Sequence, residues 1–310
     1  NVEGKIAAAL RLMGAFRVFD TDFAADLTVM EEGQEFVNRL NKGENLPIFT
    51  SCCPAWVKTA EQSYPELLPH LSSCRSPQQM FGSVMKKYFA KDNGFKPEEV
   101  FVVSLMPCSA KKFEALREEF STDGAPDVDA VVTTQELARM IKAFGIDFKA
   151  LPDETFDPAY GESTGAAVIF GATGGVAEAA LRTAYKLITG SELERGRWEP
   201  AKAGESAREM TVDIEGKEIR IATVNGLAEA RRLVEEMKTS GKQYHMVEVM
   251  ACPGGCVGGA GQHASDTLAL RACRAQGLAD IDASRPKRRS HENEAVAALY
   301  ESHLGERNGE

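Results

Sequence analysis

Short apolar runs alternate with longer segments of helical pattern along most of the chain. The apolar runs occupy residues 16–19, 46–50, 100–105, 128–133, 166–170 and 246–250, and residues 212–225 are typical of a hairpin turning at Glu215-Gly216. Helical patterns cover residues 2–13, 27–40, 111–120, 176–187 and 292–304, with further helices beginning at Pro54 and after Thr133, where Glu136 completes a capping box. This alternation predicts an α/β fold with one or two mostly parallel sheets flanked by helices. Residues 191–209 and 275–290 are predicted to be loops.

Cysteines follow three of the predicted strands. Cys52 and Cys53 come directly after residues 46–50, Cys108 follows residues 100–105, and Cys252 follows residues 246–250. Ligands of open α/β sheets bind in the crevice outside the carboxyl ends of the strands. We therefore expect the functional site to lie where these three turns meet.

Composition and charge narrow the class of protein. The chain has 310 residues, of which 43% are hydrophobic, and a formal net charge of −10. That charge argues against a nucleic-acid partner, and the one basic run, at residues 285–289, is expected to be a solvated surface segment. The apolar runs are too short to span a membrane and no signal-peptide pattern is present, so we expect a cytoplasmic protein. Because the chain begins at Asn1 without an initiator Met, we expect a fragment of a longer polypeptide.

The seven cysteines indicate metal or catalytic chemistry rather than a disulfide framework. They lie at positions 52, 53, 74, 108, 252, 256 and 273. The stretch MACPGGCVGGAGQ, residues 250–262, surrounds two of them with glycines, which let backbone approach a bulky group. Together with Cys108 and one thiol of the Cys52/Cys53 pair, these make four candidate thiolates on three loops. A four-iron cubane requires four thiolates.

Apolar packing and simpler metal sites fit the pattern of these cysteines less well. Buried cysteines can act simply as small apolar residues, and we assign that role to Cys74 and Cys273. A structural zinc site commonly uses CxxC spacings and a bacterial ferredoxin uses CxxCxxC, and the chain contains neither. Adjacent side chains on an extended backbone point to opposite faces. One metal atom would therefore not readily bind both Cys52 and Cys53.

Three long motifs carry a resemblance to a known family. TSCCPAW, MPCSAKKFE and EVMACPGGCVGGAGQ resemble the signature loops of the catalytic domain of FeFe-hydrogenases, and FDTDFAADLTVMEEG, LSSCRSPQQMFG and RRSHENEAVAALY resemble further stretches of that family. The resemblance covers nearly the whole chain. It implies two lobes of mostly parallel sheet with an H-cluster in the cleft between them. The H-cluster is a four-iron cubane joined through one thiolate to a diiron unit that carries CO, cyanide and an azadithiolate bridge.

The resemblance also implies a role for individual residues. The residues that match the cubane ligands are Cys53, Cys108, Cys252 and Cys256, with Cys256 as the bridging thiolate. Cys52 matches the thiol that passes protons to and from the bridge nitrogen, and the residues that match the path from the surface to it are Glu32, Glu35, Ser72 and Arg39. The spacing of Glu32, Glu35 and Arg39 places them on one helix face. Without the resemblance, such charges would be taken for a solvated face.

Further residues match the surroundings of the diiron unit. Lys111 matches a charge-assisted donor to a cyanide ligand, and Met106, Met250 and Gln78 match residues that line the pocket. Taken alone, the methionines would be core residues. Glu114 could have a role in the family site or could equally be an exposed helix carboxylate. The turn FGATGG, residues 170–175, lacks the features of a P-loop and the GxGxxG spacing, so nucleotide binding is not expected. The family places this turn beside the cluster.

The chain departs from the family pattern in a few places. Ala260 and His263 replace residues that are usually Gly and Pro, and we expect only a local adjustment there. A short segment of the family, often preceded by ferredoxin-like domains, is expected upstream of Asn1. We expect residues 1–280 to form the H-cluster domain and residues 281–310 to form a small-subunit-like tail.

The implied activity is that of a ferredoxin hydrogenase, which interconverts protons and electrons with H₂. The implied partners are ferredoxin or NAD(P)-linked electron-transfer subunits, together with maturation proteins that insert the diiron unit. Two other functions stay open: a non-catalytic iron–sulfur assembly relative, and a hydrogen-sensing relative. Cys52 and Lys111 favour the enzyme, because an assembly protein has no bridge nitrogen to protonate and sensors often lose the proton-carrying thiol.

Overall fold

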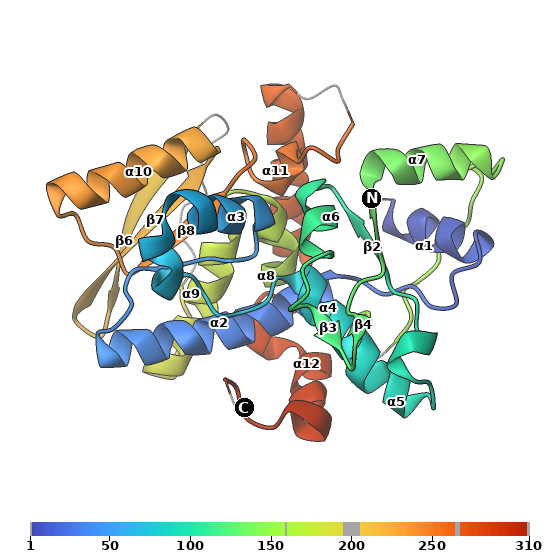
Figure 1. The fold of residues 1–310 in the computed structure, drawn as a ribbon, viewed down its shortest axis with the longest axis horizontal. Coiled ribbons are helices and arrows are strands. Elements are labelled where there is room, and N and C mark those ends of the chain that lie inside the picture. The colour runs from blue at the N-terminus through green and yellow to red at the C-terminus, as the bar shows by residue number, and fades with distance from the viewer. Residues whose placement is uncertain (1, 159, 195–204, 264–266, 309–310) are drawn as a thin grey trace.

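The computed structural model describes residues 2–158, 160–194, 205–263 and 267–308 (Figure 1). The strands are β1 (Ile48–Phe49), β2 (Val103–Met106), β3 (Ser121–Thr122), β4 (Ala125–Pro126), β5 (Ala130–Thr133), β6 (Ala207–Ile214), β7 (Lys217–Asn225) and β8 (Met246–Met250). The helices are α1 (Glu3–Leu12), α2 (Asp22–Lys42), α3 (Pro54–Ser63), α4 (Pro77–Val84), α5 (Ala90–Asp92), α6 (Ala110–Glu114), α7 (Thr134–Ala143), α8 (Gly165–Val168), α9 (Gly175–Thr189), α10 (Leu227–Ser240), α11 (Leu268–Ser284) and α12 (Glu294–Leu299).

The strands form one larger sheet and one smaller parallel pair, as the alternating pattern predicted. The larger sheet has the order β1-β8-β7-β6, in which β1, β8 and β7 are parallel and β6 is antiparallel to β7. The hairpin turns at Glu215 and Gly216, both with positive φ, which is the conformation of a tight hairpin turn. The parallel pair β2 and β5 lies apart from this sheet, and β3 and β4 form a short antiparallel ladder. The expected α/β architecture is therefore confirmed.

Helices cover both faces of the larger sheet because successive strand residues point to opposite sides. Ile221 and Met246 face a core that contains Phe36 of α2 and Leu181 of α9. Their neighbours Ala222 and Val247 face the other core, together with residues of α3 and α10. Figure 1 shows α3 and α10 on one side of this sheet, and α2 and α9 on the other.

The smaller lobe has its own core. Leu105 of β2 and Val132 of β5 pack against buried residues of α1 and α7, and Figure 1 shows both helices beside β2. Helix α7 begins with the predicted capping box, in which Thr133 Oγ1 accepts from the Glu136 N–H and Glu136 Oε2 accepts from the Thr133 N–H over 2.8 Å. In both sheets, parallel strands end shortly before a segment that carries a cysteine: β1 and β8 in the larger sheet, and β2 in the smaller one.

The last residues of the chain pack against the middle of the fold. Asp26 of α2 is fully buried and accepts hydrogen bonds from the Thr164 N–H at 2.8 Å, the Thr164 hydroxyl at 2.7 Å and Asn293 Nδ2 at 2.9 Å. Asn293 also caps α12 through its Oδ1. Helix α11 is tied by Asp282, which pairs with Arg182 of α9 and with Arg288.

Four predicted elements differ from the structure. Residues 166–170 are helical rather than a strand, because the small side chains of α8 pack among helices α2, α9 and α11 and have no strand beside them. Residues 16–19 form no strand, since the Val18 N–H donates to the Asp157 side chain instead of a ladder. Helix α6 ends at Glu114 rather than at residue 120.

The fourth difference is in the predicted loop 275–290, where α11 continues to Ser284. Only Asp282 of this helix is buried, so it lacks the apolar stripe that would have predicted it. Within the other predicted loop, residues 195–204 lie outside the described residues, and β6 already begins at Ala207.

Candidate metal centre

The three cysteine-bearing turns meet beyond the carboxyl ends of β1, β2 and β8, as predicted from the strand pattern. Cys53 directly precedes α3, and its Sγ accepts the N–H of Ala251, at the end of β8, over 3.4 Å. The Gly261 N–H donates to Pro107 O over 3.0 Å, which joins the glycine-rich loop to the Cys108 turn. These two hydrogen bonds bring the three cysteine-bearing turns, which are distant in sequence, next to one another.

Two glycines of that loop permit this close approach. A Cβ on Gly259 would lie 2.1 Å from Pro107 O, and a Cβ on Gly261 would lie 2.7 Å from Cys108 N. Any side chain at either position would force the loop away from Cys108. The residue Ala260 lies between them, and His263 follows Gln262 without interrupting the contact of Gly261 with Pro107.

The four candidate thiols act on one another electrostatically. Burial raises the pKa of Cys256, and the charges of Cys53, Cys108 and Cys252 raise it further. Burial likewise raises the pKa of Cys53, with a contribution from Cys108. Four thiolates facing each other away from solvent would need a cationic group between them. The donor set therefore fits a metal cluster held by Cys53, Cys108, Cys252 and Cys256.

The described side chains are not preset for a single metal ion. In residues 2–158, 160–194, 205–263 and 267–308, no group of three or more His, Cys, Asp or Glu side chains could hold one ion. The four thiols nonetheless share one electrostatic neighbourhood, because the charges of the other three raise the pKa of Cys256. A polynuclear iron–sulfur cluster, with thiolates at its corners, fits four such donors.

Cys52 has different neighbours from Cys53. Burial raises the pKa of Cys52 well above its ordinary value, and the next contribution comes from Glu32 rather than from another cysteine. Cys52 also belongs to the segment that Lys111 holds, because Lys111 Nζ donates to the Cys52 carbonyl oxygen over 3.1 Å. After burial, Glu32 is thus the largest influence on the pKa of Cys52, with Cys53 and Cys256 next, whereas the thiol that raises the pKa of Cys53 is Cys108.

Glu35 of α2 is the centre of a polar chain that includes Arg39, Ser72 and Cys74. Its Oε1 accepts from Arg39 Nη2 at 2.7 Å, and its Oε2 accepts from the Ser72 hydroxyl at 3.0 Å and from the Cys74 thiol at 3.7 Å. Arg39 in turn donates to four backbone carbonyls, including Leu71 O at 2.8 Å. The face that resembles a solvated stripe in the sequence is thus turned inward and bonded.

Glu32 lies at the inner end of this chain. Its side chain is 2% exposed, and burial raises its pKa to about 7, while the Ser72 hydroxyl lowers it. The charges of Glu35 and Glu248 also raise this pKa. Burial thus places the pKa of Glu32 near neutral pH, beside the Ser72 hydroxyl. The structure brings together all four residues predicted for the path.

Lys111 and Glu114 form a buried pair at the Cys108 turn. Lys111 Nζ lies 2.9 Å from Glu114 Oε2, which also accepts from the Ser76 hydroxyl at 2.9 Å and from Gln78 Nε2 at 3.1 Å. Burial by itself lowers the pKa of Lys111, but the Glu114 carboxylate outweighs it and the net pKa is raised. Glu114 is 4% exposed, so its interpretation as an exposed carboxylate is wrong.

Two of the remaining predicted pocket residues lie at strand ends, and the third, Gln78, lies on α4. Met106 is the last residue of β2 and Met250 the last residue of β8, each two positions before a cysteine. Gln78 is buried, and its Oε1 accepts from the Ser104 hydroxyl of β2 over 2.8 Å. Met106 is partly exposed and Met250 is buried.

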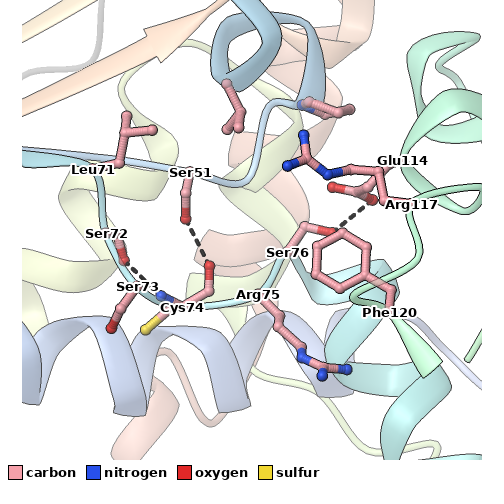
Figure 2. A pocket seen from close by; sticks show the side chains of 12 residues that line it. Ser51, Leu71, Ser72, Ser73, Cys74, Arg75, Ser76, Glu114, Arg117 and Phe120 are labelled. Atoms are coloured by element: carbon pink, nitrogen blue, oxygen red, sulfur yellow. Dashed lines mark hydrogen bonds between the residues drawn. The ribbon is translucent and has the colours of Figure 1, made fainter. Parts of the chain in front are cut away.

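A cavity of about 170 Å³ separates the polar chain from the Lys111–Glu114 pair. Figure 2 shows Ser72 and Cys74 on one wall of it, and Ser76, Glu114 and Arg117 on the other. The Ser72 hydroxyl accepts the Cys74 N–H over 3.2 Å, which leaves its hydrogen free to point at Glu35. Cys74 is therefore part of the polar chain rather than a simple apolar residue, and Cys273 is exposed rather than buried.

Two further residues support the site, although neither was predicted to do so. Glu248 of β8 is fully buried and accepts from the Gly174 N–H at 2.6 Å and the Ala177 N–H at 2.8 Å, which fixes the turn before α9. Arg274 of α11 donates to Val257 O over 2.8 Å, next to Cys256. Glu248 lies within one of the family motifs, whereas the segment around Arg274 carries no motif that could have indicated its role.

Comparison with known proteins agrees with this arrangement. Residues 1–260 match the family described as iron only hydrogenase large subunit, C-terminal domain, and residues 268–310 match iron hydrogenase small subunit. The apo FeFe-hydrogenase HydA1 of Chlamydomonas reinhardtii has a similar structure, with a TM-score of 0.87 and 38% sequence identity, over 99% of this chain and 84% of that one.

Several known proteins are similar to this chain in sequence. The NADP-reducing hydrogenase subunit HndD of Solidesulfovibrio fructosivorans is 51% identical, over 98% of this chain and 53% of that protein. Iron hydrogenase 1 of Clostridium pasteurianum is 45% identical, over 98% and 54%. The cytosolic Fe-S cluster assembly factor narfl of Xenopus tropicalis is 32% identical, over 96% and 64%. The chain thus spans about half the length of the first two relatives. No helix in its described part is long and apolar enough to cross a membrane.

Proposed function

This chain belongs to the iron-only hydrogenase family, and we propose that it catalyses the reversible conversion of protons and electrons to H₂. One observation carries the proposal: the turns with the four candidate ligand thiols meet beside a chain of buried polar side chains. That chain, through Glu35, Ser72 and Glu32, leads to Cys52, the residue directly before Cys53. An assembly protein of the narfl type would need the thiol set. It would have no use for a buried carboxyl of neutral pKa leading to Cys52.

The residues proposed to hold the cofactor are Cys53, Cys108, Cys252 and Cys256 for a four-iron cubane, with Cys256 also binding the diiron unit. Lys111 would donate to a cyanide ligand, and Met106, Met250 and Gln78 would line the pocket. When bound, this H-cluster supplies the electron exchange and the hydrogen-binding metal. The glycine contacts around Cys108 support such a group, because they let the loop that carries Cys252 and Cys256 pack directly against the Cys108 turn.

The polypeptide's own part is to move protons. Arg39 fixes Glu35 at 2.7 Å, so that Glu35 Oε2 faces the Ser72 hydroxyl at 3.0 Å. The proton then passes from Glu35 Oε2 through Ser72 Oγ to the Glu32 carboxyl, and from there to Cys52 Sγ. A carboxyl with a pKa of about 7 is well matched to this transfer at neutral pH.

We propose the remaining assignments by similarity to the relatives. Residues 1–280 form the H-cluster domain, and residues 281–310 form the small-subunit-like tail. Electrons are exchanged with ferredoxin or with NAD(P)-linked subunits, in a cytoplasmic setting, and maturation proteins insert the diiron unit. The name of HndD, an NADP-reducing hydrogenase subunit, supports the NAD(P)-linked arrangement.

The test uses the full chain matured anaerobically with the diiron unit. We expect infrared bands of CO and cyanide, and H₂ evolution from reduced methyl viologen that Cys52→Ala abolishes while its cubane and its infrared bands remain. A cubane without CO and cyanide bands would assign the chain to the assembly class. Bands with negligible turnover in the parent protein would assign it to hydrogen sensing.

A further inference from the structure

Thr173 holds a buried hydroxyl at the glycine-rich turn before α9. Its side chain is 7% exposed, and its Oγ1 has no hydrogen-bond partner in the described part of the chain. Buried hydroxyls in native proteins are nearly always bonded, because leaving one without a partner is costly. The missing partner of Thr173 is therefore expected to come from outside the polypeptide.

This turn lies directly on the loop between two candidate ligands. The Thr173 N–H donates to Gly254 O over 3.2 Å, and a Cβ on Gly255 would lie 2.8 Å from Thr173 N. Gly254 and Gly255 are the residues that separate Pro253 from Cys256. Thr173 is thus in van der Waals contact with the short segment that connects the thiols of Cys252 and Cys256.

The turn is held firmly in this place. Glu248 accepts the Gly174 N–H over 2.6 Å, and a Cβ on Gly175 would lie 1.8 Å from Ile169 O. The backbone on the C-terminal side of Thr173 is therefore bonded on one side and packed without free space on the other. The turn is therefore fixed in its position against Glu248 and Ile169.

We propose that the Thr173 hydroxyl donates a hydrogen bond to a sulfur of the cubane or of its Cys252 and Cys256 thiolates, and that this bond raises the cubane's reduction potential. The inference rests on the proposed function in that it needs the cubane. Hydrogen bonds to cluster sulfurs stabilise the reduced form, which carries the additional negative charge. Thr173 would then help to set the potential at which electrons reach the site.

The experiment compares Thr173→Val with Thr173→Ser in protein reconstituted with iron and sulfide but not with the diiron unit. Valine keeps the shape and removes the hydroxyl, whereas serine keeps the hydroxyl. A redox titration followed by electron paramagnetic resonance should show a more negative midpoint for Thr173→Val, with an about fivefold lower ratio of reduced to oxidised cubane at the parent's midpoint, as expected for one hydrogen bond. Thr173→Ser should restore the parent's value.

A second measurement separates a cluster partner from a hidden protein partner. In cluster-free protein, Thr173→Val should unfold at the same urea concentration as the parent or at a higher one, since the hydroxyl has no partner there. A lower urea midpoint would overturn the inference, and so would an unchanged potential. If Thr173→Val loads less iron per chain, Thr173→Ala decides the potential instead. A parent chain that forms no cubane would contradict the proposed function itself.

Discussion

The ammonium of Lys111 donates a 3.1 Å hydrogen bond to the carbonyl oxygen of Cys52, which lies 59 residues earlier in the chain. This bond joins the Cys108 turn to the paired cysteines before any cofactor is considered. Because Lys111 also binds Glu114, it is a structural tie as well as a proposed ligand contact. Its two roles can be measured separately.

Removing the Lys111 charge is expected to destabilise the cluster-free protein by about 3 kcal/mol, because the Glu114 carboxylate would stay buried without its cation. Urea unfolding of Lys111→Met measures this. The double variant Lys111→Met/Glu114→Gln should recover most of the loss, since no uncompensated charge remains. Equal losses in the single and the double variant would mean that the pair's charges do not matter to stability.

Breaking the polar chain at Glu35 is expected to lower H₂ evolution by about 100-fold or more, in the range for loss of a proton-transfer group. Glu35→Gln keeps the shape and the contact with Ser73 but removes the proton-carrying carboxylate. The measurement is the rate with reduced methyl viologen at equal cofactor content. Asn38→Ala, also on α2 but bonded to Gln34, is the matched control and should keep the parent rate.

The stability of the cluster-free protein is expected to fall as the pH rises from about 4.5 to about 7. Burial raises the pKa of both Glu32 and Glu248 from 4.5 to about 7, so the folded state holds protons that the unfolded state has already released. A shift of this size corresponds to about 3 kcal/mol for each group at most. Below pH 4.5 and above pH 7 neither group contributes further change.

Glu32→Gln should make this pH dependence about half as steep, because glutamine carries no titrating proton and the contribution of Glu248 remains. Urea midpoints at several pH values between about 4.5 and about 8 give the slope for the variant and the parent. A variant whose slope equals the parent's would show that Glu32 titrates at its ordinary pKa in the fold. Asn38→Ala, also on α2, removes no titrating group and is the control that should leave the slope unchanged.

Asn293→Ala is expected to loosen the C-terminal helix from the rest of the fold. The change removes the N-cap of α12, which is worth about 1 kcal/mol, and one donor to the buried Asp26 carboxylate. Hydrogen exchange should therefore quicken in residues 294–304 more than in α9. Ser302→Ala, which bonds only to its own helix, is the comparison variant. If residues 294–304 exchanged no faster in Asn293→Ala than in Ser302→Ala, the role assigned to Asn293 would be contradicted.

Much of this arrangement could be predicted because strand ends and cysteines coincide in the sequence. The apolar run before each of Cys53, Cys108 and Cys252 is short, ends abruptly and is followed by a turn. The residues around each cysteine therefore suffice to predict where the strand ends. Residues 166–170 have the same apolar character but form a helix, because their neighbours in space are helices from elsewhere in the chain. No local pattern reports such neighbours.

The supporting residues could not be predicted for the same physical reason. Cys74 has a functional contact only because α2 brings Glu35 to it, and Glu248 becomes a helix cap only because α9 starts against β8. For Glu114 the choice between a role at the site and an exposed carboxylate stayed open, because its position on a short helix says nothing of Lys111, Ser76 and Gln78 around it. Burial of a polar group depends on distant segments, and one sequence does not reveal those segments.

The hydrogen bond from Arg274 to Val257 O has a consequence for biosynthesis. Helix α11 is translated after the loop that contains Cys252 and Cys256. In a nascent chain, that loop therefore lacks its hydrogen bond from Arg274 until α11 has left the ribosome. Metal that binds during translation would bind to a loop that α11 does not yet hold in place. Metal that is inserted after α11 has docked would bind to the complete site.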